Sequence, residues 1–432
     1  MAAQRSMAAF VLAIAAALSL VFPPRSARAQ NFTLRYIVSL ENSREPVVSV
    51  RWELAGIDEV QEISLRFRGP SPRELKATGI LLQEGERWIW RPTQPYARLF
   101  YRVDVNSRRG SQQRFDSYLA SNWLVSHARQ LFPLVGVTYR APYGAPAAYS
   151  KLRSRATLAF QMPPGWRCVA PYAARQQNVF ELSGRRSFLT PRGWFACGHL
   201  ESEAREIAGV RIELAQVGGV AGDREEIFTF LEATFPLLHR LLAGDTARIL
   251  IIRAPDPMWH GGISGEGSLF LHAKRPVRDP DRTSAYLHEL FHVLQPFKPA
   301  ADADWLVEGL AEFYSLELQR RAGLLDERGF KKGLRLFERY GLWNVDLRRQ
   351  HDNPATNNSA PLVLYALDQR IQRLTAGKAR LDDVLRRLAE SQSRVDSATF
   401  QSTAESVAGA SLKRFFERYV FAGQVPQLNR VD

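Results

Sequence analysis

The sequence has 432 residues, with 58 lysines and arginines against 44 aspartates and glutamates, and its formal net charge is +14. The basic residues are scattered and no nucleic-acid-binding motif accompanies them, so the charge indicates a solvated surface and no nucleic-acid partner. A chain of this length exceeds one hydrophobic core, which predicts two domains.

Residues 1–29 have the pattern of a bacterial Sec-type signal peptide. Arg5 precedes an apolar stretch from Met7 to Phe22, and Ala27-Arg28-Ala29 offers a cleavage site of the A-x-A type. We therefore expect an exported mature chain, periplasmic or secreted. No later stretch approaches the roughly 18 consecutive apolar residues of a membrane span, so we expect no transmembrane segment after cleavage. An uncleaved N-terminal anchor is the alternative.

An alternation of apolar and polar residues characterises residues 30–201. It runs through residues 48–54, 63–67 and 99–105, and turn residues such as Gly69-Pro70 separate these stretches. A period of two predicts antiparallel strands with one face in water. We expect this part of the chain to form an antiparallel β-sandwich.

The two cysteines of the chain, Cys168 and Cys197, lie in this β-rich part. An even number of cysteines in an exported chain favours one disulfide bond between them. Two separate buried thiols are the alternative, because the sequence does not fix the distance between the two residues.

Residues 202–432 change to a helical period and are expected to form a second, mostly helical domain. Asp223 followed by Glu226 is a capping box that opens a helix through Leu242, kinked or interrupted near Pro236. The other expected elements are strands over 247–253 and 268–272, the second as the edge strand above a cleft, and amphipathic helices over 326–340, 360–374, 380–390 and 410–421.

A candidate metal centre stands out in this second part. His288, Glu289 and His292 form the pattern H-E-x-x-H, and Glu308 follows downstream. Positions i and i+4 of a helix share a face, so both imidazoles can bind one metal ion. Glu308 would supply a third ligand and leave a fourth position open, as catalytic zinc requires. We expect one Zn²⁺ per chain, with Glu289 beside it as a general base that takes a proton from water.

The residues around the motif favour a metal site over a chance match. Leu287, Leu290 and Phe291 make the helix apolar on nearly every side, so it should be buried and end before Pro296. Burying two imidazoles and a carboxylate without partners is unfavourable, and a divalent metal removes that penalty. The alternative is two hydrogen-bonded core histidines beside an incidental glutamate.

The segment from Trp305 to Tyr314 resembles the W-L-x-E-G-x-x-E-[FY]-[FY] block of gluzincins, the thermolysin-like zinc peptidases. Within that group the chain is most similar to the glycyl aminopeptidase family, with further matches at Met162 to Trp166 and Thr375 to Lys378. The resemblance implies an α+β fold, in which a β-rich N-terminal domain precedes a thermolysin-like, mostly helical zinc peptidase domain. Many members also carry a PDZ domain, which we do not expect in this chain because the two expected domains account for its sequence.

The resemblance also assigns roles to individual residues. His288, His292 and Glu308 match the zinc ligands of the family, and Glu289 matches its general base. Glu312 lies one helical turn after Glu308 and would reach back to a ligand imidazole, fixing its tautomer. The alternative for Glu312 is an ordinary exposed helix glutamate.

The chain departs from the family at the strand that binds substrate. The G-G-L-E-H strand of the family corresponds to residues 261–265, of which Gly261, Gly262 and Ser264 are possible substrate-binding residues here. Ser264 therefore replaces the glutamate that holds the free amine of the substrate. Glu266 follows two residues after Ser264.

A second departure concerns the tyrosine that stabilises the oxyanion in the family. Its Y-x-K-G block aligns with residues 357–360, where the sequence reads Asn-Asn-Ser-Ala. Tyr340, His351 and Tyr365 are candidate substitutes among which the sequence does not choose. An oxyanion donor can lower a barrier by several kcal/mol, so its loss affects rate and not zinc binding.

We expect an exported zinc metallopeptidase that hydrolyses peptide bonds of a peptide or protein substrate. One alternative is a zinc-binding but catalytically weak relative that acts in peptide binding or envelope assembly. Another is a zinc hydrolase that acts on a different envelope amide, such as a peptidoglycan crosslink. The sequence leaves the oligomeric state open.

Overall fold

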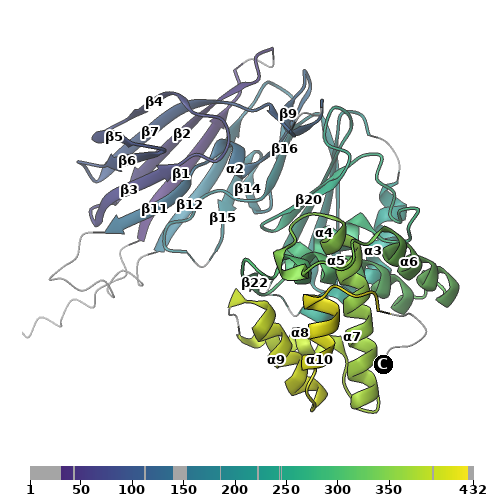
Figure 1. The fold of residues 1–432 in the computed structure, drawn as a ribbon. Coiled ribbons are helices and arrows are strands. Elements are labelled where there is room, and N and C mark those ends of the chain that lie inside the picture. The colour runs from purple at the N-terminus through teal and green to yellow at the C-terminus, as the bar shows by residue number, and fades with distance from the viewer. Residues whose placement is uncertain are drawn as a thin grey trace, which may run out of the picture.

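The structure is a computed structural model that describes residues 31–426, except 42–43, 111–112, 140–152, 185, 221–222, 243, 245 and 392–393. The expected signal peptide, residues 1–29, lies outside the described residues. Figure 1 shows a β-rich first half beside a second half in which helices predominate. Within the described part of the chain, no helix has the length and apolar character needed to span a membrane.

The first half consists of three sheets around one hydrophobic core. Seven strands lie in the order β14 (Ala173–Gln176), β15 (Val179–Leu182), β12 (Arg153–Gln161), β1 (Asn31–Ser39), β2 (Val47–Ala55), β7 (Tyr96–Asp104) and β4 (Arg73–Ala77). Five lie in the order β13 (Arg167–Val169), β16 (Trp194–Gly198), β10 (Trp123–His127), β9 (Phe115–Leu119) and β8 (Ser107–Arg108). The third sheet has the order β11 (Leu134–Tyr139), β3 (Val60–Arg66), β6 (Arg87–Arg91) and β5 (Ile80–Glu84).

The alternation in the sequence correctly predicts which strand residues face the core. Val48, Val50, Trp52 and Leu54 of β2 are all fully buried. The expectation of purely antiparallel strands was wrong, because β1 and β12 pair in parallel. Side chains alternate between the two faces of a strand whichever way its neighbour runs, so a period of two does not encode strand direction.

The predicted disulfide between Cys168 and Cys197 is confirmed. The two residues lie directly opposite each other on the antiparallel strands β13 and β16. Both are buried in the core of the first half. The bond therefore ties the short strand β13 to the sheet.

The second half begins with a mixed sheet in the order β17 (Leu200–Ile207), β18 (Val210–Val217), β19 (Arg248–Ala254), β21 (Ser268–His272) and β20 (Gly262–Gly265). The boundary expected after residue 201 falls inside β17.

Residues 268–272 were expected to form the edge strand of the sheet, and this expectation was wrong. Strand β21 is buried along its whole length between β19 and β20, and the glycine-containing β20 forms the edge. A fully buried run is typical of an inner strand.

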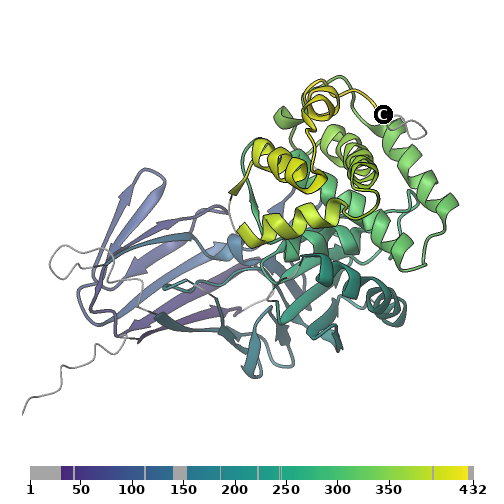
Figure 2. The ribbon, with the colours of Figure 1, turned by 90° about the horizontal axis from the view of Figure 1, so that it is seen from below.

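Helices cover this sheet and extend beyond it (Figures 1 and 2). They are α3 (Arg224–Leu242), α4 (Ala285–Leu294), α5 (Asp304–Arg321), α6 (Glu327–Tyr340), α7 (Ala360–Leu374), α8 (Leu381–Ser391), α9 (Ser397–Ala408) and α10 (Lys413–Phe416). Shorter elements are the helical segments η3 (Leu347–Arg349), η4 (Ala355–Ser359) and η5 (Glu417–Phe421) and the strands β22 (Lys298–Pro299) and β23 (Arg394–Val395). Helix α3 continues through Pro236 without interruption.

Helix α9 was not predicted, although its ends carry readable signals. The Asp396 side chain accepts a hydrogen bond from the backbone N–H of Thr399 at 2.7 Å, and Gly409 ends the helix with a φ of 64°. Both are common helix caps. The sequence between them is rich in serine and threonine, which disfavour helix interiors and obscure the apolar face.

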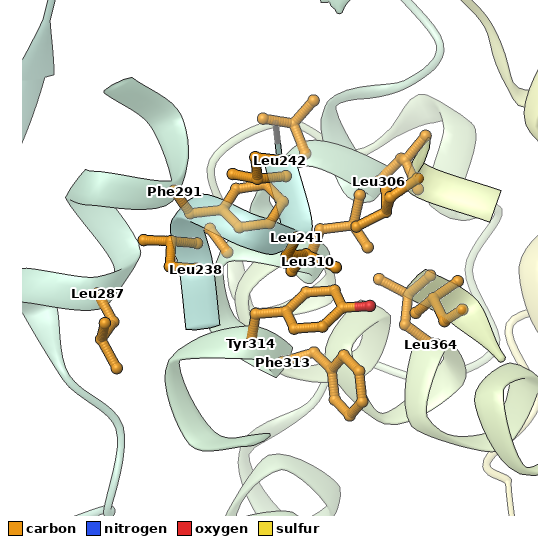
Figure 3. Packing of buried hydrophobic residues seen from close by; sticks show 14 of the residues in the cluster. Leu238, Leu241, Leu242, Leu287, Phe291, Leu306, Leu310, Phe313, Tyr314 and Leu364 are labelled. Carbon is orange, nitrogen blue, oxygen red and sulfur yellow. The ribbon is translucent and has the colours of Figure 1, made fainter. Parts of the chain in front are cut away.

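Helices α4 and α5 pack against each other in the largest core of the molecule. Leu287 and Phe291 of α4 lie with Leu310 and Tyr314 of α5 among side chains from α3 and α7 (Figure 3). The rings of Phe291 and Tyr314 stack with centroids 5.9 Å apart. This apolar contact fixes the relative position of the two helices that carry the candidate metal ligands.

A smaller core joins the two halves of the chain. Trp194 of β16 packs on Phe270 of β21 with ring centroids 5.3 Å apart, and its backbone N–H donates to Ser268 Oγ at 2.7 Å. Val125 of β10 and Ile252 of β19 belong to the same cluster. The β-rich half is therefore packed rigidly beside the sheet that ends in β20.

A buried ion cluster stabilises the C-terminal end of α5. The carboxylate of Glu317 is almost fully buried and accepts hydrogen bonds from Arg320, Arg321 and Arg380 at 2.8 to 3.0 Å. Arg321 also donates to Asp382 at 2.6 Å, which connects α5 to α8. Burial acts to raise the pKa of Glu317, but the arginine hydrogen bonds outweigh it and lower that pKa.

We predict that Glu317→Gln lowers the free energy of unfolding by about 2–4 kcal/mol, because it removes a buried anion that three partly buried guanidinium groups share. Denaturant unfolding measures the loss, and Glu327→Gln, at an exposed pair with Lys331, is the control. The folded-state pKa of Glu317 is depressed. Its contribution to the free energy of unfolding is therefore fully present above the unfolded-state pKa, and it is lost as the pH falls through the folded-state pKa. Equal stability of the two variants at neutral pH would contradict the prediction.

Candidate metal centre and cleft

Helix α4 places two imidazoles on one face. Its first turn is capped by Ser284, whose backbone oxygen accepts from the N–H of His288 at 2.9 Å. One turn later His292 points the same way, and the Nε2 atoms of His288 and His292 are 3.0 Å apart. The i and i+4 spacing therefore produces the shared face that the motif predicted.

Helix α5 brings a carboxylate to these imidazoles. Glu308 Oε2 lies 3.5 Å from His288 Nε2, and Oε1 lies 3.6 Å from His292 Nε2. One ligand atom from each of the three residues lies within 4.8 Å of the other two. Three nitrogen and oxygen ligands that converge from one side are the protein contribution to a catalytic zinc site, so the residues present fit a zinc ion.

The charges of the three side chains also fit a cation. Burial acts to lower the pKa of His288, but the carboxylates of Glu312 and Glu308 outweigh it and hold that pKa well above its usual value. Burial acts to raise the pKa of Glu308, but hydrogen bonds from His288 and His292 outweigh it and hold that pKa well below its usual value. The site therefore favours a positive charge between its members, which a proton or a divalent metal supplies.

Glu312 is not an ordinary exposed glutamate. Its Oε1 lies 3.2 Å from the Nδ1 atom of His288, on the side of the ring opposite Glu308. A carboxylate at Nδ1 keeps the proton on that nitrogen and leaves Nε2 free to bind a metal. Glu312 is therefore placed to orient the ring of His288.

Glu289 lies beside the three ligands and is buried, with 7% of its surface exposed. Burial raises its pKa, while the two histidines and a backbone hydrogen bond from Ser264 act in the opposite direction. Strand β20 lies close above it: a Cβ atom at Gly262 would lie 2.8 Å from Glu289 Cγ and 2.7 Å from Leu271 Cδ2. Only glycine at this position lets the edge strand approach the carboxylate so closely.

These residues line a cleft with a volume of about 670 Å³. Both halves of the chain contribute to its wall, since Arg109 and Arg129 come from the β-rich half. The cleft is lined by Arg109, Arg129, Trp259, Gly262, Ile263, Ser264, Arg275, Asp279, Asp281, Thr283, Ser284, Ala285, His288, Glu289, His292, Glu308, Glu312, Asp352 and Asn357. The β half carries no motif that could have revealed its two arginines in the sequence.

The expected substrate-binding residues divide into two groups. Gly262 and Ser264 line the cleft. Gly261 does not, because the indole of Trp259 covers it: a Cβ atom at Gly261 would lie within 2.1 Å of that ring. Glu266 is exposed in the turn after β20, where it lies 3.6 Å from Arg192 and outside the cleft.

None of the three expected substitutes for an oxyanion tyrosine lines the cleft. Tyr340 is exposed, Tyr365 packs on aromatic rings of α5 and α6, and His351 Nδ1 is 2.5 Å from Asp304 Oδ2. Asn357, which aligns with the missing tyrosine, does line the cleft. Its alignment with the tyrosine of the Y-x-K-G block was the feature of the sequence that could have identified Asn357.

A second group of potential metal ligands is formed by Asp256, His260 and His272. Its carboxylate is already bound by Arg114 and by Lys274, whose Nζ is 2.8 Å away. Nδ1 of His272 accepts the backbone N–H of Lys274 at 3.2 Å, so Nε2 carries the proton of the neutral ring. These residues form an ion-pair cluster and do not present free ligand atoms to a metal.

No protein-family model matches the chain, and no curated protein matches its sequence. Solved structures do match. An aminopeptidase N family protein from Idiomarina loihiensis has a TM-score of 0.67 and 16% identity over 90% of this chain and 76% of its own. An M1 zinc metallopeptidase from Deinococcus radiodurans, in a variant bound to a Tyr-Ser-Ala substrate, has a TM-score of 0.63 and 16% identity over 94% and 96%. The chain therefore has the fold of the M1 zinc metallopeptidases, which confirms the gluzincin fold that the resemblance implied.

Proposed function

We propose that this chain is an exported zinc-dependent metallopeptidase that hydrolyses peptide bonds. The observation that carries the proposal is the convergence of His288, His292 and Glu308 within 4.8 Å of one another, in a cleft that also holds the buried Glu289. The fold supports the same conclusion, since one matching structure is a zinc metallopeptidase bound to a tripeptide substrate. The sequence motifs also resemble those of glycyl aminopeptidases. Membership of that particular family stays a prediction.

In the proposed enzyme, His288, His292 and Glu308 hold one zinc ion, and Glu312 orients His288. Zinc bound in such a site supplies Lewis-acid chemistry, lowering the pKa of water and polarising a carbonyl group. Glu289 accepts a proton from the attacking water and returns it to the leaving amine. Burial raises the pKa of Glu289, which makes its carboxylate a better acceptor for the proton of water.

Asn357 is the residue that we assign to the developing oxyanion. Its amide oxygen accepts a hydrogen bond from Thr356 Oγ1 at 3.0 Å, which leaves the two N–H donors for the cleft. An asparagine amide can stabilise an oxyanion in place of a tyrosine hydroxyl, because both donate a hydrogen bond where negative charge develops.

The proposed enzyme should bind one zinc ion per mature chain. Elemental analysis after zinc reconstitution should give a stoichiometry near one, and His292→Ala should lose the metal. Glu312→Gln should weaken zinc binding about 10- to 100-fold, as removal of a carboxylate behind a ligand histidine does elsewhere. Glu390→Gln, at an exposed position of α8, is the matched control. Full zinc retention by His292→Ala would refute the ligand set.

Glu289→Gln should reduce peptide hydrolysis by at least about 10²-fold and leave zinc content unchanged, because the amide keeps the shape of the side chain and loses its basicity. Turnover of a diverse peptide library by wild type and variant, with metal content measured in parallel, provides the test. Wild-type rates in the variant, under conditions where chemistry limits turnover, would remove Glu289 from the mechanism.

Asn357→Ala should lower kcat roughly 10²- to 10³-fold with a much smaller change in KM, because an oxyanion donor acts in the transition state. Asn357→Asp, which keeps the size but has no N–H donors, should be similarly slow. The neighbouring Asn358 does not line the cleft, so Asn358→Ala is the control. An unchanged kcat in Asn357→Ala would show that another group holds the oxyanion.

Blocked or internal peptide bonds should be cleaved at least as well as bonds next to a free N-terminus. Ser264 offers a hydrogen bond but no charge, and an unpaired ammonium in a desolvated cleft costs several kcal/mol. Kinetics on matched pairs of peptides, one free and one N-acetylated, measure the preference. A strong preference for the free amine would mean that another carboxylate, such as Asp352 at the cleft wall, holds it.

The absence of an oxyanion tyrosine favours one second candidate, a zinc-binding protein that holds peptides and turns them over slowly. The same experiments separate the two functions. Stoichiometric zinc with peptide binding, but no zinc-dependent turnover in the library, would support the binding protein. Cleavage only of another envelope amide, such as a peptidoglycan crosslink, would instead identify a different hydrolase.

A further inference from the structure

The wall that the β-rich half contributes to the cleft carries an arginine without an ionic partner. Arg129 lies in the short helix α2 (Ala128–Leu131) and lines the cleft together with Ser264 and Glu289. Among the described residues, no carboxylate forms an ion pair with it. By contrast, Arg109 bonds to Asp116 at 3.1 Å, and Arg275 bonds to Asp279 at 2.8 Å.

The backbone that carries Arg129 is held firmly. Its neighbours Ala128, Gln130 and Leu131 are buried, and Arg129 is the exposed residue of the helix. The N–H of Ala128 donates to the backbone oxygen of Gly193 at 2.8 Å, and the hydroxyl of Tyr101 donates to that of Leu131 at 2.6 Å. Arg129 is therefore presented to the cleft from a fixed support.

Arg129 also lies at a defined end of the cleft, next to the end of strand β20. The ring of His127 accepts the backbone N–H of Arg129 through Nδ1 at 3.1 Å. The Nε2 atom of the same ring lies 2.9 Å from where a Cβ atom of Gly265 would be. Burial lowers the pKa of His127 to about 3, so this ring is neutral near pH 7 and adds no charge. Among the residues that the structure describes, Arg129 therefore places a positive charge without an ion-pair partner at the cleft end beside Ser264.

The acidic residues of the cleft do not neutralise that charge. Asp279 is bound by Arg275, and Asp281 accepts from the N–H and hydroxyl of Thr283 at 3.0 and 2.7 Å. Glu289, Glu308 and Glu312 belong to the candidate metal centre, and Asp352, which also lines the cleft, forms no ion pair with Arg129 in the described part of the chain. An unpaired guanidinium in a concave site is complementary to a carboxylate, which it binds with two parallel hydrogen bonds.

We propose that Arg129 binds a carboxylate of the substrate, so that the cleft selects acidic peptides. This inference rests on the proposed function, which supplies the peptide as the class of substrate, and it adds a preference for acidic peptides. The carboxylate has two possible sources, an Asp or Glu side chain or the C-terminus of a short peptide. Arg109, stacked on Trp259 with its guanidinium 3.7 Å from the ring centroid, forms the neighbouring part of the same wall.

The test uses fluorescence-quenched peptide substrates that share one sequence. At each position in turn, a peptide with Glu is compared with the same peptide with Gln. A second pair compares a free C-terminal acid with the amide. Wild type should favour one Glu position, or the free acid, roughly 10- to 100-fold in kcat/KM, the range expected of a hydrogen bond to a charged group. Arg129→Gln should bring that ratio near one. Arg155→Gln, at an exposed position of β12, should keep it.

A binding measurement separates this inference from the proposed function. Zinc-loaded Glu289→Gln, with and without Arg129→Gln, is titrated with the same peptides labelled for fluorescence anisotropy. A preference for the acidic peptide that disappears with Arg129→Gln supports the inference even if wild type hydrolyses no peptide. Hydrolysis or binding without any acidic preference, a preference that survives Arg129→Gln, or no peptide binding at all would overturn it.

Discussion

The contact between α4 and α5 is the constraint on which the rest of the site depends. Apolar side chains such as Phe291 and Tyr314 lock the two helices together. The same packing forces His288, His292, Glu308 and Glu312 into contacts of 3.0 to 3.6 Å at the border of the core. Polar groups so close together and so poorly hydrated are unfavourable unless a shared cation compensates them. The hydrophobic effect thus assembles a site whose electrostatics favour a positive ion.

The far end of α5 needs its own anchor for this arrangement to hold. The buried cluster around Glu317 attaches the last turn of α5 to α8 through arginines. Helix α5 therefore carries Glu308 and Glu312 in its first half and an ion-pair anchor near its end. Fixing both ends limits rotation of the helix, and rotation would move Glu308 and Glu312 away from His288 together.

The cleft is a product of both halves of the chain. The core that contains Trp194 and Phe270 packs β16 against β21, which places α2 beside the end of β20. The second half contributes the candidate metal centre and Asn357, whereas the β-rich half contributes Arg109 and Arg129. In the proposed enzyme the chemistry thus comes from one half of the chain, and the charge that selects the substrate comes from the other.

The sequence by itself determined the features that depend on local spacing. The face shared by His288 and His292 and the buried positions of β2 follow from periods of 3.6 and 2, which neighbouring residues set. Pairing between distant segments was decided by the tertiary structure alone. Parallel pairing of β1 with β12, the edge position of β20 and the presence of Arg129 and Ser264 in one cleft each join residues far apart in the chain. Such contacts depend on how whole sheets and helices pack, and no local period records them.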